Sequence, residues 1–420
     1  MNNSSENAGK KALFNTIMLY VLAVAKIVFP LLTLPFLTRT LSVDCYGAVS
    51  YVKSVIAYVQ IIIDFGFILS SVKDIVKAQE DKDQVNYIVG NTIFAKFLLS
   101  LVALVFILIL ALTVPILRSY RLLLFLSFLP PLLSIFLLDF FFRGIEKMHI
   151  VSIIFVTMKT ISTVLTVTLI HNDDQVLLIP IFDIISSFTA ILLSWIIFIK
   201  LGYRIKANGI KNAVVKIKDS CLYFTNSVAS SAFGALNTAI IGICIEDLQQ
   251  VAFWSVSMQL VGAIQTMYTP LSNGIYPYMI KNKNLTVIKK ILLVFMPLVI
   301  GGTILAGWLS PILLTIVSGE KYRGASVVFK HLLPILIFSF PVTVLGWPTL
   351  GSIDKIKAIN TSTFIGAFVQ ITGLLILYIF DSFYILNVAI LRNLSEISMC
   401  ITLFYFTIKY RRLFASESDK

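Results

Sequence analysis

Nine ionisable side chains lie inside long apolar stretches of the sequence, where a charge needs a chemical reason. The basic ones are Lys26, Lys53, Lys96, Lys159 and Arg392, and the acidic ones are Asp64, Asp139, Asp183 and Glu396. A charge at mid-depth in a bilayer costs about 2.5–3.5 kcal/mol, so five cations facing lipid would cost on the order of 12–17 kcal/mol. These groups must therefore face one another or water. Cations in a hydrated chamber can hold an anionic group.

Helical geometry places many of the polar side chains on common faces. At about 100° per residue, Lys53, Gln60 and Asp64 share one line of a helix with Tyr46 and Ser71. Similar lines hold Asn15, Lys26, Thr33 and Thr40, then Asn226, Ser230 and Asn237, and finally Gln259, Thr266, Asn273 and Pro277. The simplest arrangement turns all four polar stripes onto one central, water-filled cavity.

Polar residues in membrane helices also join helices to one another through hydrogen bonds. For Asn237 and Gln259 that alternative stays open. Lys53 and Asp64 lie three turns apart on one face and cannot pair directly, which favours a cavity for that stripe.

Two pairs of opposite charge are spaced four residues apart, Asp139 with Arg143 and Arg392 with Glu396. Side chains at this spacing meet on a helix surface, so either pair could be a structural ion pair rather than a functional one. Asp183 could cap a helix or act as a relay.

The composition indicates an all-α integral membrane protein. The chain has 420 residues, of which 58% are hydrophobic and 13% charged, whereas a soluble domain is about 45–50% apolar and about 25% charged. Apolar stretches of about 20 residues or more indicate helices rather than a barrel, whose strands are shorter and alternate. The polar opening, MNNSSENAGK, lacks the layout of a cleavable signal, so we expect a retained first span.

Twelve membrane spans in two six-helix lobes account for the apolar stretches. They cover 13–37, 48–71, 87–114, 121–142, 150–170, 176–199, 220–245, 250–279, 289–316, 328–350, 358–380 and 384–408. We expect an N-terminal lobe over 1–199, a basic cytoplasmic linker over 200–219, and a C-terminal lobe with a short cytoplasmic tail over 220–420. Two six-helix bundles around a midplane site are a common transporter plan.

The basic residues predict the orientation in the membrane. If the N-terminus is cytoplasmic, the inner segments hold 23 of the 34 Lys and Arg residues and the outer segments hold six. This bias predicts that both termini are cytoplasmic. It also explains the net charge of +13 without a nucleic-acid partner.

The sequence offers little support for enzyme, metal or cofactor chemistry. Four scattered cysteines form no CxxC pair, and three histidines stand apart, so neither a zinc site nor a disulfide framework is indicated. No GxxxxGK[ST] motif occurs, so energy would come from an H⁺ or Na⁺ gradient, from the membrane potential or from removal of the product. The short outer loops count against a membrane-bound glycan enzyme.

Four stretches together resemble one known family. FPLLTLPFLTRTLSVDCYGAVSY (29–51), DFGFILSSVKDI (64–75), DFFFRGIEKMHI (139–150) and SGEKYRGA (318–325) resemble, in order, segments of Wzx-type polysaccharide flippases. These belong to the multidrug/oligosaccharidyl-lipid/polysaccharide exporter superfamily. Ser42, Phe140 and Arg143 replace the family's usual Gly, Trp and Gln.

The resemblance implies a flippase of a bacterial cytoplasmic (inner) membrane. Such a protein would move undecaprenyl-pyrophosphate-linked oligosaccharide repeat units from the cytoplasmic to the outer leaflet by alternating access. Its partners would be that lipid-linked substrate, membrane lipid and other polysaccharide assembly proteins. The alternatives are an ion-coupled drug exporter of the same superfamily and, less favoured, a membrane-bound glycan enzyme.

These considerations predict two sets of site residues. We expect substrate-binding groups at Lys26, Lys53, Gln60, Lys96, Lys159, Asn226, Asn237, Gln259 and Arg392. We expect ion-coupling or gating groups at Arg39, Asp64, Asp139, Arg143, Asp183 and Glu396. Mid-depth cations such as Lys26 favour an anionic cargo over the cationic drugs of the alternative.

Overall fold

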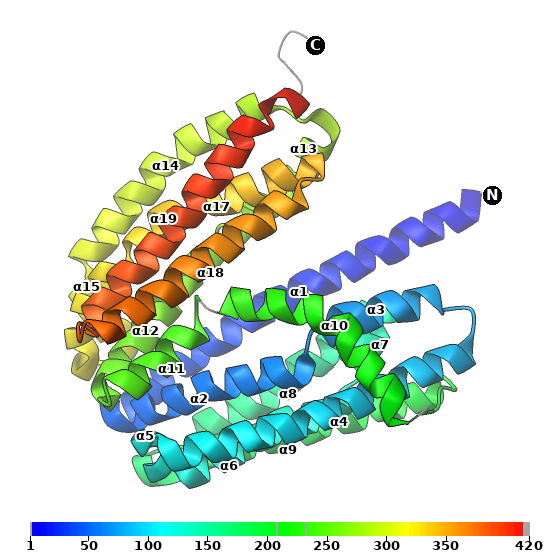
Figure 1. Cartoon of the computed structure of the whole chain (residues 1–420), viewed down its shortest axis with the longest axis horizontal. Helices are drawn as coiled ribbons and strands as arrows, with labels where there is room; N and C mark the ends of the chain where they lie inside the picture. The colour runs from blue at the N-terminus through cyan, green and yellow to red at the C-terminus, as the bar shows by residue number, and fades with distance from the viewer. Residues whose placement is uncertain (1, 207–208, 232, 415–420) are drawn as a thin grey trace. The chain divides into compact units, whose positions relative to one another are not determined.

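The computed structural model describes residues 2–206, 209–231 and 233–414 (Figure 1). For residues 2–13, 16, 222, 226 and 230 it describes the backbone only. The described residues form helices joined by turns and loops, with no strand, which confirms the all-α prediction. Contacts divide the chain into two compact units, Met1–Val228 and Ala229–Lys420. We call them the first unit and the second unit and describe each by itself.

The first unit contains the helices up to and including most of α10. They are α1 (Asn2–Thr40), α2 (Val43–Asp64), α3 (Phe67–Lys77), α4 (Lys82–Thr113), α5 (Pro115–Ser119), α6 (Arg121–Leu133), α7 (Asp139–Gly144), α8 (Met148–Leu169), α9 (Leu178–Lys200) and α10 (Ile210–Ser231). Within this unit α8 packs between α1 and α9, and α6 packs against both α2 and α9.

The second unit contains the remaining helices. They are α11 (Ala235–Cys244), α12 (Leu248–Thr266), α13 (Thr269–Asn282), α14 (Leu285–Trp308), α15 (Ser310–Ser318), α16 (Ser326–Leu332), α17 (Pro334–Val344), α18 (Ile356–Ile379) and α19 (Ile385–Lys409). A π-helical segment, Leu345–Leu350, follows α17. Two long helices of this unit, α18 and α19, pack against each other.

Ten helical segments among the described residues are long and apolar enough to cross a membrane. They coincide with the first six and the last four predicted spans. The seventh and eighth predicted spans are each two shorter helices, α10 with α11 and α12 with α13. Large apolar side chains remain exposed, for example Leu112 at 73% and Trp308 at 78%, as expected for surfaces that face lipid rather than water.

The second predicted span is broken at its DFG sequence. α2 ends at Asp64, and Phe65 and Gly66 both adopt left-handed backbone angles, with φ of 40° and 75°. A Cβ atom at position 66 would lie 2.5 Å from Cβ of Tyr223 and 2.9 Å from its carbonyl carbon. Glycine therefore allows both the turn and the close approach of α10.

The linker predicted over 200–219 is helical in its second half, because α10 begins at Ile210 and packs on α3. Lys216 forms an ion pair with Asp74, and the hydroxyl oxygens of Ser70 and Ser220 lie 2.6 Å apart. The first half of α10 therefore belongs to the first compact unit, which ends at Val228, and the predicted two-lobe division at residues 199 and 220 stays a prediction.

Three consecutive phenylalanines of the DFFFRG sequence form the core of the first unit. Phe140, Phe141 and Phe142 are each at most 2% exposed. The ring of Phe141 meets Phe198 edge-on at 4.9 Å between centroids and Tyr203 at 4.8 Å. This cluster holds α7 against α9, which fixes the neighbouring Asp139 and Arg143 at the site described below.

We predict that Gly66→Ala destabilises the protein more than Gly209→Ala. Both glycines have positive φ, and an L-residue there costs about 1–2 kcal/mol. Only at position 66 would the methyl group overlap neighbouring atoms, since nothing lies within 4 Å of a Cβ at position 209. Overpacking adds roughly 1–3 kcal/mol.

The measurement is an apparent melting temperature. Each detergent-solubilised variant is heated, and the temperature at which half of its monodisperse size-exclusion peak is lost is recorded. Equal losses in the two variants would contradict the close packing of α10 on the turn.

Candidate functional site

A cavity of about 480 Å³ lies within the first unit. Its walls come from α1, α2, α3, α6, α7, α8 and α9 and from the segment that joins α6 to α7. Eight of the predicted site residues line it together, namely Lys26, Lys53, Gln60, Asp64, Asp139, Arg143, Lys159 and Asp183. The structure therefore brings residues from five predicted spans to one place.

The polar stripe of α2 faces this cavity over part of its length. Lys53, Gln60 and Asp64 line it at intervals of seven and four residues, which keeps them on one helical face. The two ends of the predicted stripe, Tyr46 and Ser71, do not line the cavity. Both are buried, and the Ser71 hydroxyl lies 3.0 Å from that of Thr92.

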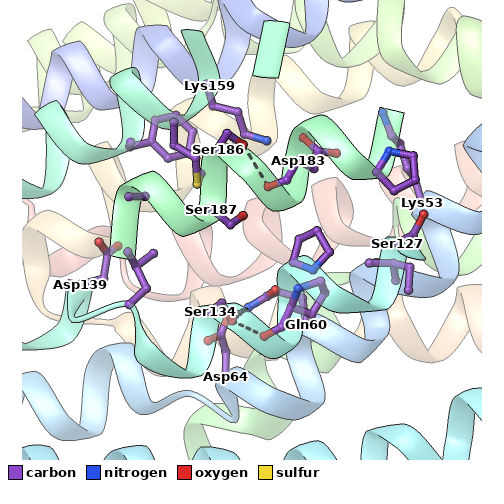
Figure 2. Close-up of a pocket in the computed structure, with 18 of the residues that line it drawn as sticks. Lys53, Gln60, Asp64, Ser127, Ser134, Asp139, Lys159, Asp183, Ser186 and Ser187 are labelled. Atoms are coloured by element: carbon purple, nitrogen blue, oxygen red, sulfur yellow. Dashed lines mark hydrogen bonds between the residues drawn. The ribbon is translucent and has the colours of Figure 1, made fainter. Parts of the chain in front are cut away.

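Figure 2 shows Gln60, Asp64 and Ser134 on one side of the cavity. The Gln60 amide nitrogen donates to Asp64 Oδ2 at 2.7 Å and lies 3.0 Å from Ser134 Oγ. The other oxygen of Asp64 accepts from Lys96 Nζ at 2.8 Å. The Asp64 carboxylate is thereby held between an amide and an ammonium group.

Lys96, whose predicted role as a substrate ligand stays a prediction, lies outside the lining of the cavity. Its side chain is 8% exposed, whereas that of Asp64 is 42% exposed. It lies behind the Asp64 carboxylate, with its ammonium group 5.9 Å from the centroid of the Phe140 ring. In this arrangement Lys96 neutralises Asp64.

The Asp139 and Arg143 pair forms across one turn of α7. Arg143 Nη2 lies 3.7 Å from Asp139 Oδ2, and both residues line the cavity. The spacing of four residues sets this contact. The pair neutralises a second carboxylate, yet both groups still face the open space.

Lys159 and Asp183 lie on the opposite side of the cavity in Figure 2. Asp183 accepts a hydrogen bond from Ser162 Oγ at 2.6 Å. Lys26 contacts the ring face of Phe155, with its ammonium nitrogen 5.8 Å from the centroid. Among the described residues, none forms an ion pair with Lys26, Lys53 or Lys159.

Sequence reasoning missed the hydroxyl groups of this cavity. Ser127, Ser134, Ser186 and Ser187 line it as well. Their spacing carried a usable signal, because Ser127 and Ser134 are seven residues apart and Ser186 and Ser187 follow Asp183 by three and four.

The remaining predicted residue of the first unit with a described side chain is Arg39. It is exposed near the end of α1 and does not line the cavity. The side chain of Asn226 lies outside the described residues, so its predicted role stays a prediction.

In the second unit, Asn237 lies in a buried hydrogen-bond chain rather than at a cavity. Its side-chain oxygen accepts from Gln370 Nε2 at 2.8 Å, and the Gln370 oxygen accepts from Ser395 Oγ at 2.8 Å. Both Asn237 and Gln370 are fully buried. This chain joins α11, α18 and α19, which favours the helix-packing alternative for Asn237.

Arg392 and Glu396 form a buried ion pair in α19. Their atoms Nη2 and Oε2 lie 2.8 Å apart, with side chains 6% and 5% exposed. The guanidinium carbon lies 4.9 Å from the centroid of the Phe233 ring. This buried pair matches the structural alternative for residues at this spacing, and the predicted roles of Arg392 in substrate binding and of Glu396 in coupling stay predictions. Gln259 is half-buried on α12 and does not line the first-unit cavity, so its predicted role stays a prediction.

The first-unit cavity carries an excess of positive charge. The partners described above neutralise two of its three carboxylates, which leaves Lys26, Lys53 and Lys159 facing Asp183 alone. Ammonium groups in a partly desolvated space attract anions more strongly than in bulk water. Together with amide and hydroxyl groups, they can hold a phosphate-bearing headgroup.

The chain resembles known membrane proteins over most of its length. A protein of Escherichia coli (strain K12) named "Putative O-antigen transporter" is 24% identical over 331 residues, which cover 76% of this chain and 79% of that protein. The structure titled "Lipid II flippase MurJ, inward closed conformation" has a TM-score of 0.68 at 13% identity and covers 94% of this chain and 87% of that one.

The same fold occurs in a multidrug resistance MATE family transporter of the MOP superfamily in its inward-facing conformation. Its TM-score is 0.64 at 12% identity, covering 93% of this chain and 98% of that chain. Residues 12–283 match the family described as polysaccharide biosynthesis protein. Because this match spans more than half of the sequence, the chain belongs to the polysaccharide biosynthesis protein family.

Proposed function

We propose that this protein is a flippase of the bacterial inner membrane. Its cargo is an oligosaccharide repeat unit linked to undecaprenyl pyrophosphate, which it moves from the cytoplasmic to the outer leaflet by alternating access. The family supports a role in polysaccharide biosynthesis, and the name of the Escherichia coli relative points to transport of O-antigen. In this proposal the protein performs no bond chemistry.

The observation that carries the proposal is the positive excess of the first-unit cavity, where Lys26, Lys53 and Lys159 outnumber Asp183. A transporter of cationic drugs would need a cavity in which carboxylates outnumber ammonium groups. A pyrophosphate crossing hydrocarbon without partners would lose its water at great cost. The lysines replace that water with charge-assisted hydrogen bonds, while the prenyl chain stays in lipid.

The proposal includes a source of energy and an orientation. Both termini are cytoplasmic in this proposal, as the distribution of basic residues predicts. Translocation then moves the anionic pyrophosphate of the cargo outward. The membrane potential favours that direction by about 2.3 kcal/mol per elementary charge per 100 mV. An H⁺ or Na⁺ gradient acting through Asp139 or Asp183 is the alternative source, and other polysaccharide assembly proteins would remove the product.

The first test is deletion of the gene in the source bacterium. We expect lipid-linked repeat units to accumulate in the cytoplasmic leaflet, because the sugar headgroup cannot cross the membrane unaided. Their sidedness is measured by accessibility to a membrane-impermeant glycosidase or lectin in intact and inverted vesicles. A strain with normal sidedness and raised drug sensitivity would instead support the exporter.

The second test removes cations from the cavity. Lys26→Ala and Lys53→Ala should each reduce translocation at least tenfold, because each loses a charge-assisted contact of about 1.5–3 kcal/mol. Lys206→Ala is the matched control, since Lys206 pairs with Asp83 at 2.9 Å on the exposed surface and that contact raises its pKa. Full activity in both cavity variants at normal expression would refute the role of the lysines.

A third test separates neutralisation from cargo binding at Asp64. Lys96→Met leaves the carboxylate without its cation and should lower both thermal stability and translocation, because the half-exposed Asp64 then stays in a membrane helix with its charge unpaired. The double variant Lys96→Met/Asp64→Asn should recover stability and most of the activity. Failure of the double variant to recover translocation, with stability restored, would place Asp64 or Lys96 directly in transport.

A further inference from the structure

A second cavity, of about 350 Å³, lies within the second unit. It is formed by α13, α17, α18, α19 and the π-helical segment Leu345–Leu350. Half of its lining residues carry hydroxyl or amide groups, and none of the lining residues is charged.

The chemistry of this lining narrows the ligand class. A pyrophosphate group needs cations or several donors, and a prenyl chain needs an apolar wall. An uncharged polyhydroxyl ring needs hydrogen-bonding groups without charge beside an apolar surface, because its faces are apolar and its rim is polar. The second-unit cavity supplies that combination, whereas the first-unit cavity supplies charge.

Trp347 provides the apolar surface. It lies in the π-helical segment, is 53% exposed and lines the cavity. Pro348 has no N–H to donate, and Gly346 departs from helical geometry with ψ of −109°, so the helix distorts at this point. The distortion presents the indole to the cavity, and the Tyr276 ring supports it edge-on at 6.5 Å between centroids.

The polar groups of the cavity divide into acceptors and donors. The hydroxyls of Thr343, Ser362 and Thr363 donate to backbone carbonyls of their own helices at 2.9, 2.7 and 3.3 Å. Their hydrogens are thereby engaged. Thr343 and Thr363 are partly exposed, so their oxygens can accept from a ligand hydroxyl, whereas Ser362 is 1% exposed. Asn273, exposed on the polar face of α13, adds both a donor and an acceptor.

We infer that the second-unit cavity is a carbohydrate subsite that binds an uncharged sugar ring of the cargo. The ring stacks on Trp347, and Asn273 and the neighbouring hydroxyls bond its rim. This inference rests on the proposed function, in which the first-unit cavity holds the pyrophosphate of the same class of substrate.

The test compares two probes on purified protein in nanodiscs. One is undecaprenyl pyrophosphate, and the other is the lipid-linked oligosaccharide pool extracted from the deletion strain. Trp347→Ala should weaken binding of the glycosylated pool roughly tenfold, a change of about 1.4 kcal/mol, and leave undecaprenyl pyrophosphate unaffected. Trp347→Phe should retain most of the binding, and Asn273→Ala should show the same selective loss.

Trp308→Ala is the matched control, because Trp308 is 78% exposed and lies outside the cavity. Equal weakening of both probes by Trp347→Ala would mean that the cavity holds the prenyl chain or only supports the fold, and would overturn the inference. So would unchanged binding of the pool in both Trp347→Ala and Asn273→Ala. If the wild-type protein binds neither probe, the proposed function itself fails.

Discussion

A charge within a membrane-spanning helix must be neutralised by a partner or reach water, and this constraint organises the first unit. Lys96 and Asp64 satisfy it by pairing at 2.8 Å with the lysine buried, and Arg143 and Asp139 satisfy it within one turn of α7. Lys53 instead satisfies it by facing a cavity. The cavity is thus more than a space for a ligand, because without it the lysines that line it would face hydrocarbon at about 2.5–3.5 kcal/mol each.

The two units meet the same constraint differently. In the first, carboxylates and ammonium groups face a shared open space. In the second, Arg392 and Glu396 are sealed together at about 5% exposure, and the lining of the cavity is uncharged. The proposed cargo has a charged phosphate end and a neutral sugar end, which require different surroundings, and the linings of the two cavities differ in the same way.

The sequence was sufficient to predict helices and most spans, because helical periodicity and the cost of a buried charge both act locally. Lys53, Gln60 and Asp64 could be placed on one face from their spacing alone. The partner of Asp64 could not, because Lys96 reaches it from another helix and no local pattern encodes that meeting. The burial of Asn237 against Gln370 and the docking of α10 on Gly66 likewise depend on packing between distant segments. The chamber predicted between the two halves stays a prediction.

The types of the cations bear on how a transporter releases its cargo. Arg143 and Arg392 each pair with a carboxylate four residues away on their own helix, whereas the cavity cations without an ion pair are all lysines. A guanidinium group grips phosphate through two parallel hydrogen bonds, while an ammonium group is a hydrated point charge that exchanges partners readily. The proposed function requires a site that binds the cargo on one side of the membrane and releases it on the other, so lysines near Asp183 would suit a pyrophosphate cargo better than a fixed arginine clamp.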